Sequence, residues 1–222
     1  MKLYMIVGSG NCRKVQATAN HLGIKLDYEY LDWLSMDHKK PEYLAVNPNG
    51  RVPTLRDGDF TLWESAAIMQ YLANKVPGNT LFPTDNQLRA DITRWQCWET
   101  AHFNRWLGML VYETVLKPQF LKQEPTPTVV KNAQSELAGF AAVLEAQLQG
   151  RDYLVGNHIT LADYSVIQQE SFSPAVPFDW HAYPNIAAYF ERMRAVPHWA
   201  STAPSSPAAA GRKPPESATR YA

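Results

Sequence analysis

The first third of the chain alternates between short apolar runs and a segment with helical periodicity. Residues 2–7 form an apolar run that predicts a strand, and residues 26–31, where Leu and Tyr recur at every second position, predict another. Between them, Ser9 or Asn11 is suited to begin a helix and Gly23 is suited to end it. This βαβ order favours a parallel pair of strands.

The residues that follow extend the same domain and are divided by turn-forming sequences. Asn47-Pro-Asn-Gly is typical of a turn, and Asp57-Gly-Asp suits a hairpin because Asp-Gly tolerates positive φ. The expected elements are a short helix, two hairpin strands and a longer helix, at residues 38–46, 52–56, 60–63 and 64–75. The pattern therefore predicts an α/β domain over residues 1–76, in the order βαβ-α-ββα.

Beyond this domain the pattern changes to helices alone. Residues 77–87 contain two prolines and a glycine without periodicity, which indicates a linker. Apolar residues spaced three and four apart then predict helices at residues 88–116, 130–148, 160–169 and 184–196. We therefore expect an all-α helical-bundle domain over residues 88–200. Residues 201–222, with four prolines and many small side chains, predict a weakly structured tail.

Composition narrows the function classes. The 21 basic and 21 acidic residues cancel, so no overall field attracts nucleic acid or an anionic membrane. No apolar run approaches the roughly 20 residues that span a bilayer, and residues 1–8 are too short for a secretory signal. We therefore expect a cytoplasmic protein without nucleic-acid or membrane partners, in which Cys12 and Cys97 are free thiols.

Two sequence features that often carry chemistry are incomplete in this chain. Gly8-Ser9-Gly10 lies between a strand and a helix, as in dinucleotide-binding proteins, but Arg13 occupies the third glycine position. The six histidines show no paired ligand spacing, and Cys-x-x-Cys is absent. We therefore expect neither a dinucleotide nor a metal.

Two dipeptides stand at the two ends of the predicted hairpin. Val52-Pro53 is interpreted either as an edge-strand proline or as a cis bond, which would leave the Val52 N–H and C=O free to pair with an extended peptide. Glu64-Ser65 is interpreted either as a helix cap or as an anion site, because a helix N-terminus has unpaired N–H groups. The hairpin folds back, so both dipeptides can face one cleft.

These motifs together resemble the cytosolic glutathione transferase family. The similar stretches are Asn47-Pro-Asn-Gly-Arg-Val-Pro-Thr-Leu, Asp57-Gly-Asp, Trp63-Glu-Ser-Ala-Ala-Ile and Thr160-Leu-Ala-Asp. His38-Lys-Lys-Pro-Glu-Tyr-Leu resembles the plant phi class and its bacterial relatives, so we expect a phi- or theta-like member of the serine type. The resemblance implies a thioredoxin-like N-terminal domain, a helical C-terminal domain, a homodimer, and glutathione as co-substrate without another cofactor.

The resemblance also implies which residues hold glutathione. Val52, beside Pro53, pairs with the cysteinyl backbone of the ligand. Ser65 and Glu64 hold the γ-glutamyl carboxylate and amine. The glycyl carboxylate lies near three basic side chains, namely His38, Lys39 and Arg51.

The catalytic task is to stabilise the thiolate of glutathione, because the thiolate is the nucleophile. Ser9 matches the position of the family's serine, and Asn11 is the second candidate for a donor to the sulfur. The alternative is that Cys12, at a helix start, is acidified and forms a mixed disulfide with glutathione. The position of Cys12, three residues after Ser9, does not match the catalytic cysteine of such family members.

The second substrate is expected to lie in an apolar pocket. The candidate wall residues are Trp98, His102, Trp106 and Tyr112, although bundle packing explains them equally well. We therefore expect a glutathione transferase that acts on a small hydrophobic electrophile, as in detoxification. The alternatives are a glutathione-dependent disulfide or peroxide reductase, and a non-catalytic interaction module with the same fold.

Thr160 and Asp163 have the spacing of a capping box, with Asp in place of the usual Glu. We expect the Thr160 hydroxyl to accept from the Asp163 N–H and the Asp163 carboxylate to accept from the Thr160 N–H. Both residues are therefore predicted to be structural.

Overall fold

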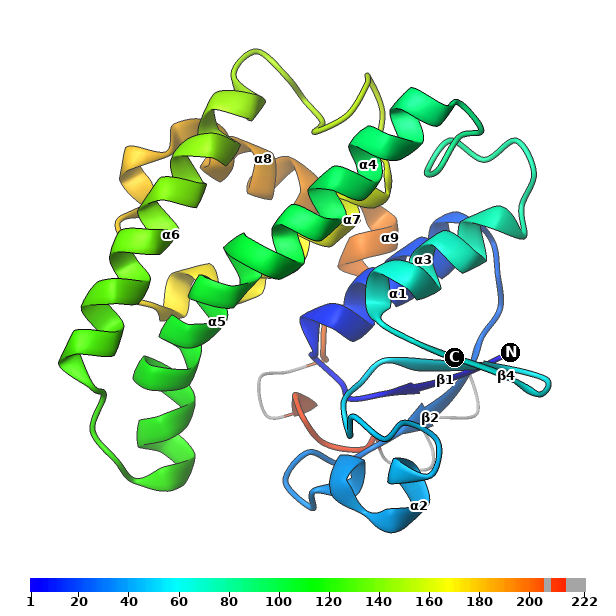
Figure 1. The fold of residues 1–222 in the computed structure, drawn as a ribbon, viewed down its shortest axis with the longest axis horizontal. Coiled ribbons are helices and arrows are strands. Elements are labelled where there is room, and N and C mark those ends of the chain that lie inside the picture. The colour runs from blue at the N-terminus through cyan, green and yellow to red at the C-terminus, as the bar shows by residue number, and fades with distance from the viewer. Residues whose placement is uncertain (206–208, 215–222) are drawn as a thin grey trace. The chain divides into compact units, whose positions relative to one another are not determined.

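The computed structural model describes residues 1–205 and 209–214, and contacts divide the chain into two compact units. Unit 1 consists of Met1–Phe82 together with Val196–Ala222, and unit 2 consists of Pro83–Ala195 (Figure 1). Among the described residues, no helix is long and apolar enough to cross a membrane.

Unit 1 contains a four-stranded sheet in the order β2-β1-β3-β4. The strands are β1 (Lys2–Met5), β2 (Asp27–Tyr30), β3 (Thr54–Asp57) and β4 (Phe60–Trp63). β1 pairs with β2 in parallel, with Leu3 opposite Tyr28, which confirms the predicted parallel pair. β3 runs antiparallel to both of its neighbours, and it forms the predicted hairpin with β4.

Three helices and a short 3₁₀ segment cover the two faces of this sheet. α1 (Gly10–His21) and α3 (Ser65–Asn74) pack against each other on one face, whereas η1 (Asp37–Lys39) and α2 (Pro41–Leu44) lie by the other (Figure 1). Their apolar faces bury residues such as Val15 and Ile68 completely. The arrangement is a thioredoxin-like α/β fold, as the sequence predicts.

The end of the chain belongs to unit 1. α9 (Pro197–Ala200) packs on α1, and the Arg13 guanidinium lies 4.0 Å from the centre of the Trp199 ring. The Arg13 Nε donates to the Thr202 hydroxyl at 3.1 Å. Residues 196–200, which the sequence analysis assigns to the helical domain, thus group with unit 1, because the Trp199 side chain is fully buried against this face.

The predicted tail begins at residue 201, and its described part, residues 201–205 and 209–214, has defined hydrogen bonds. Gly211, for example, donates to the Val7 carbonyl at 2.8 Å. Such backbone groups can be paired even where few large apolar side chains are present. The rest of the predicted tail lies outside the described residues.

Unit 2 is helical, as predicted. Its longer helices are α4 (Asn86–Trp98), α5 (Asn104–Val111), α6 (Pro127–Leu148), α7 (Leu161–Ile167) and α8 (Pro184–Arg194). Its shorter segments are the π-helical η2 (Glu99–Phe103) and η3 (Tyr112–Leu121) and the 3₁₀ turns η4 (Gln168–Ser171), η5 (Ser173–Ala175) and η6 (Trp180–Ala182).

The first predicted helix of unit 2 differs from the expectation. It is divided by η2 and continues through η3 to Leu121, beyond Pro118, where the sequence predicts that it has already ended. Pro118 lies inside the π-helical η3, whose wider turn accommodates a residue without a backbone N–H.

The start of α7 is fixed by the capping box formed by Thr160 and Asp163. Asp163 Oδ2 accepts from the Thr160 N–H at 2.8 Å and from its hydroxyl at 3.0 Å. Asp163 Oδ1 accepts from the Leu154 N–H at 2.9 Å and from the Tyr189 hydroxyl at 3.2 Å. The carboxylate is fully buried, so these four donors replace water, and burial raises its pKa to about 6.

Candidate functional site

A hollow of about 70 Å³ lies in unit 1, where the predicted glutathione-binding dipeptides come together. The start of α1, the turn after α2, the segment before β3 and the junction of β4 with α3 each contribute to its wall. It is lined by Asn11, Asn47, Asn49, Arg51, Val52, Pro53, Trp63, Glu64 and Ser65. Both dipeptides that end the hairpin thus face the same hollow, as the sequence analysis expects.

The Val52-Pro53 bond on one wall is cis. The carbonyl of the preceding Arg51 is held by the Tyr43 hydroxyl at 2.6 Å and by Asn47 Nδ2 at 2.9 Å. The hydrogen bonds among the described residues include none to the Val52 backbone. Val52 therefore presents an N–H and a C=O that an extended peptide can pair with.

The opposite wall is the start of α3. Glu64 has φ 70°, a left-handed conformation that is uncommon for a residue with a side chain and that often marks a functional position. Ser65 is 8% exposed, and its hydroxyl donates to Asn11 Oδ1 at 3.3 Å. Because the first N–H groups of a helix have no partner within the helix, this wall is suited to a carboxylate.

Both candidates for the sulfur donor lie at the start of α1, and they differ in their distance from the hollow. Asn11 lines the hollow, and because its Oδ1 accepts from Ser65, its side-chain amide is left as a donor. Ser9 is the N-cap of α1 and is half-buried, but it is not among the lining residues. The geometry thus places the second candidate of the sequence analysis nearer to the hollow than the first.

Cys12, the alternative thiol, lies in the core. Its side chain is fully buried, and burial raises its pKa to about 11, although hydrogen bonds with the Ile6 backbone and Ser9 act in the other direction. This shift is opposite to the acidification that a mixed disulfide with glutathione requires.

His38 and Lys39 do not line the hollow but lie beside one of its walls. Lys39 Nζ donates to the Gly50 carbonyl at 2.8 Å, next to Arg51. Gly50 has φ +57°, and a Cβ there would lie 2.9 Å from the His38 carbonyl, so only glycine fits. The buried His38 Nδ1 has no partner among the described residues, and burial, followed by the charge of Lys39, lowers its pKa.

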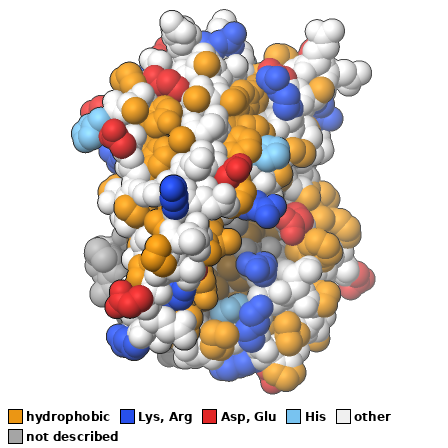
Figure 2. All heavy atoms as spheres, turned by 60° about the vertical axis from the view of Figure 1, so that its left-hand side comes forward, with side chains coloured by type: hydrophobic (Ala, Val, Ile, Leu, Met, Phe, Trp, Pro, Cys, Tyr) orange, Lys and Arg blue, Asp and Glu red, His pale blue; other side chains and the backbone are white. Residues whose placement is uncertain are grey.

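Arg51 is the one basic side chain that both lines the hollow and is exposed. Figure 2 shows both basic and acidic side chains on the face that it draws, with several basic ones gathered in its lower half. Among the described residues, no group of three or more His, Cys, Asp or Glu side chains has the geometry to hold a metal ion.

The four predicted wall residues of the second-substrate pocket lie on different segments of unit 2. Trp98, at the end of α4, stacks on Phe103 with 5.3 Å between ring centres, and His102 stacks on Phe140 at 4.8 Å. Trp106, on α5, lies 5.2 Å from the Arg105 guanidinium, and Tyr112 is 44% exposed. Their role toward a substrate stays a prediction.

Three residues that line the hollow are absent from the sequence-based set. Asn47 and Asn49 belong to the turn before Val52, and the Asn47 side chain organises it, because its Oδ1 accepts from the Asn49 N–H at 3.0 Å. Trp63 ends β4 next to Glu64. The signal was present in Asn47-Pro-Asn-Gly, whose side chains bond to nearby backbone and so fix turn geometry.

Two sequence families match the chain. Residues 3–80 match "Glutathione S-transferase, N-terminal domain" and residues 101–197 match "Glutathione S-transferase, C-terminal domain". A probable glutathione S-transferase of rice (Oryza sativa subsp. japonica) is 31% identical over 199 residues, 89% of this chain and 93% of that protein. Glutathione S-transferase 3 of maize (Zea mays) is 32% identical over 212 residues, 93% of this chain and 95% of that protein.

Solved structures of glutathione transferases are also similar to this chain. Glutathione transferase F2 from Populus trichocarpa, at 24% identity, has the same fold, with a TM-score of 0.82 over 90% of this chain and 96% of that chain. A glutathione S-transferase-I bound with lactoylglutathione is 28% identical, with a TM-score of 0.79 over 91% of this chain and 97% of that chain. The chain therefore belongs to the glutathione S-transferase family.

Proposed function

We propose that this protein binds glutathione in the hollow of unit 1, stabilises its thiolate and transfers it to a small hydrophobic electrophile. The observation that carries the proposal is that the hollow combines the unpaired backbone of Val52 with the start of α3 at Ser65. One wall suits the backbone of a peptide and the other suits a carboxylate, and glutathione has both. A structural neighbour was solved with a glutathione conjugate.

In this proposal each part of glutathione has its own contacts. The cysteinyl N–H and C=O pair with Val52 beside Pro53. The γ-glutamyl carboxylate lies on the N–H groups and hydroxyl of Ser65, and Glu64 takes the amine. Arg51 is free to reach the glycyl carboxylate, with His38 Nδ1 as a second donor when protonated, while Lys39 holds the Gly50 turn.

The proposed chemistry is stabilisation of the thiolate by a hydrogen-bond donor. A free thiol has a pKa of about 8.5, so at neutral pH most of the glutathione is protonated unless the site lowers that pKa. The Asn11 amide is the favoured donor because Asn11, unlike Ser9, lines the hollow. The Ser9 hydroxyl, which bonds with Cys12, is the second candidate.

The thiolate then attacks the electrophile. In a substitution, the sulfur–carbon bond forms as the leaving group departs with its electron pair. In an addition, the same bond forms as the π electrons of a double bond move to the atom at its other end. No cofactor besides glutathione takes part. As in the family that the chain resembles, we propose a phi-like protein that forms a homodimer, and sedimentation would measure its oligomeric state. We also propose that the protein is cytoplasmic, because both cysteines are free.

The thiol-transfer form of the reductase alternative needs a protein thiolate, and the buried Cys12 with its raised pKa does not support one. Cys12→Ala should therefore retain conjugation of glutathione to a chlorodinitrobenzene, because the nucleophile belongs to glutathione. Loss of conjugation together with disulfide exchange would favour the reductase. Absence of both activities in the wild type would favour the interaction module.

Single substitutions at the two walls test the transferase proposal. Ser65→Ala should raise the KM for glutathione about tenfold and change kcat less, because the bond to the γ-glutamyl carboxylate exists in ground and transition states alike. Asn11→Ala should lower kcat about 10- to 1000-fold and raise the apparent pKa of the bound thiol. Ser135→Ala, at an exposed position of α6, is the control.

The assignment of the sulfur donor has its own outcome. If Asn11→Ala keeps the wild-type kcat and Ser9→Ala loses it, the donor is Ser9. An unchanged glutathione KM in Ser65→Ala would remove the anion site, and with it the proposed binding mode.

A further inference from the structure

Gly211 lies between the carboxyl ends of two parallel strands. Its N–H donates to the carbonyl of Val7, two residues after β1, at 2.8 Å. Its carbonyl accepts from the N–H of Trp33, three residues after β2, at 2.7 Å. β1 and β2 are hydrogen-bonded to each other directly up to Leu31, so beyond that point Gly211 provides the link between them.

The fit at this link is close. Gly211 has φ +79°, which disfavours any residue with a side chain. Gly8 has φ +80°, and a Cβ added there would lie 3.0 Å from the Ala210 Cβ. The tail therefore covers Gly8, the residue immediately before Ser9.

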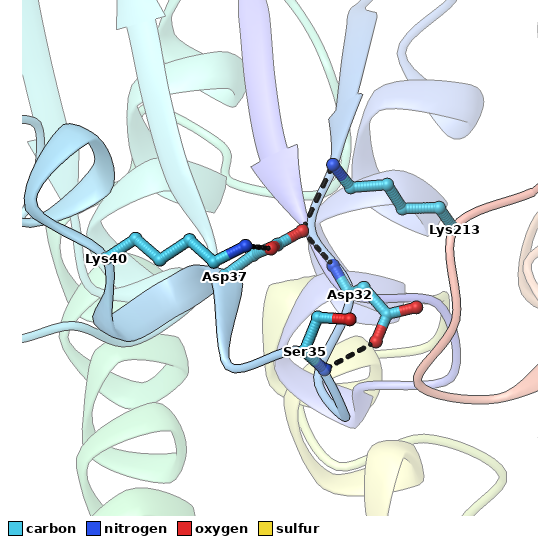
Figure 3. Close-up of polar contacts among 5 residues, drawn as sticks. All are labelled: Asp32, Ser35, Asp37, Lys40 and Lys213. Atoms are coloured by element: carbon cyan, nitrogen blue, oxygen red, sulfur yellow. Dashed lines mark hydrogen bonds and ion pairs between the residues drawn. The ribbon is translucent and has the colours of Figure 1, made fainter.

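A second contact of the tail lies on the segment after β2. Figure 3 shows Asp37 between Lys40 and Lys213, with its carboxylate also accepting from the Asp32 N–H. Lys213 Nζ lies 3.0 Å from Asp37 Oδ2, and Lys40 Nζ lies 2.6 Å from Oδ1. Asp37 is the residue immediately before His38. Lys40 first, and then the Asp32 N–H and Lys213, hold the pKa of this carboxyl well below its usual range, so it stays charged at neutral pH.

The tail thus contacts two segments at the point where each leads into the proposed glutathione site. One segment continues from Gly8 to Ser9 and Asn11, and the other continues from Asp37 to His38. At these contacts neither segment is in a strand or an α-helix, because Gly8 lies in a turn and Asp37 begins the single 3₁₀ turn η1, so each depends on such contacts for its position.

We propose that residues 209–214 form a clasp that holds the β1–α1 and β2–α2 segments in the geometry that binds glutathione, with Gly211 and Lys213 as positioning residues. The inference rests on the proposed function, since the site that the clasp positions is the proposed glutathione site. The clasp touches no ligand itself. Its effect is expected in the affinity for glutathione, because misplaced segments must be reordered on binding.

Gly211→Ala should raise the KM for glutathione about five- to tenfold while the KM for the electrophile stays constant, because a left-handed Ala costs enough to loosen the link. The control is Gly58→Ala, in the β3–β4 turn, where φ is +60° and a Cβ would meet nothing within 4 Å. Both variants introduce the same backbone strain, so both lower stability, but only Gly211→Ala should change the KM. Hydrogen exchange without ligand should become faster at residues 7–11 and 32–39 in Gly211→Ala alone.

Lys213→Met provides a second variant that does not depend on backbone strain. It should raise the KM for glutathione about two- to fivefold, the range expected for one partly exposed ion pair. Arg212→Met, an exposed basic residue next to it, should leave the KM unchanged.

The outcomes separate the clasp from the proposed function. If the wild type binds glutathione and Gly211→Ala has the same KM and exchange pattern as Gly58→Ala, the clasp is wrong and the proposed function stands. If the wild type shows no heat of glutathione binding and no conjugation, the proposed function fails and the positioning role falls with it.

Discussion

Asp37 in unit 1 and Asp163 in unit 2 are both buried carboxylates, and they are held in opposite ways. Asp163 is fully buried and accepts from four neutral donors of its own unit, and burial raises its pKa to about 6. Asp37 is 8% exposed and lies between two lysines, which together with the Asp32 N–H lower its pKa. The two residues differ in partners more than in burial.

The difference separates a structural carboxylate from a positioning one. The neutral donors around Asp163 are two backbone N–H groups and the hydroxyls of Thr160 and Tyr189, and all four bonds are lost together when the carboxylate is removed. The lysines around Asp37 have exposed side chains on separate segments, so each can be removed at a small cost in stability. Asp163 thus fixes the start of α7, whereas Asp37 links segments that the proposed ligand requires to be in register.

The largest expected effect is on stability, from Asp163→Ala. The substitution leaves buried donors without an acceptor, which should cost about 3 kcal/mol and lower the Tm by about 6–12 °C. The folded fraction should keep its affinity for glutathione. Calorimetric unfolding and glutathione titration would measure both quantities.

Asp152→Ala is the control, since its side chain is 74% exposed and its ion pair with Arg192 spans 3.4 Å. It should change stability by less than about 1 kcal/mol. An unchanged Tm in Asp163→Ala would show that water replaces the four bonds, and a large rise in KM at normal Tm would make Asp163 a site residue.

The next effect is smaller and affects function as well. Asp37→Asn keeps the shape of the side chain but removes its charge, so stability should fall by about 1–2 kcal/mol and the KM for glutathione should rise about two- to fivefold. Asp57→Asn is a matched control in the same unit, because Asp57 also pairs with a lysine, Lys75, at 2.7 Å, but it lies at the end of β3 and not beside His38. Equal KM values in the two variants would contradict a positioning role for Asp37.

The smallest effect is a difference in pH dependence, on the order of 1 kcal/mol, with opposite signs for the two residues. The folded-state pKa of Asp37 lies below its ordinary 3.8, so its contribution to stability is present above that pH and lost as the pH falls further. The folded-state pKa of Asp163 lies above 3.8, so its contribution grows as the pH falls from about 6 to 4.

Unfolding free energies across this pH range would measure each contribution as the difference between the wild type and Asp37→Asn or Asp163→Ala. The same sign for both differences would contradict the contrast between a carboxylate held by lysines and one held by neutral donors.

Local signals in the sequence were sufficient for part of this picture. Thr160-Leu-Ala-Asp specifies its own hydrogen bonds over one helical turn, and the structure has those bonds at the same residues. The hairpin, the parallel pair and the convergence of Val52 with Ser65 likewise follow from turn chemistry and short connections. The roles of these residues toward glutathione came from the family resemblance.

The features of the fold and of the site that the sequence does not predict depend on contacts between distant parts of the chain. Nothing near Gly211 in the sequence indicates that Val7 and Trp33 are its partners, since the tail consists mostly of small residues and prolines with a few charged side chains. The structure was also needed to show that Asn11 and not Ser9 lines the hollow, because both residues can begin a helix.

The grouping of Val196–Ala222 with Met1–Phe82 has a consequence for the order of synthesis. A ribosome releases the sheet, α1 and α3 first, then the whole of unit 2, and only afterwards Trp199 and Gly211, which cover α1 and link the strand ends. Unit 1 is therefore begun before unit 2 and completed only after it. Until residues 196–214 are synthesised, α1 lacks the cover of Trp199 and the strand ends lack the clasp formed around Gly211.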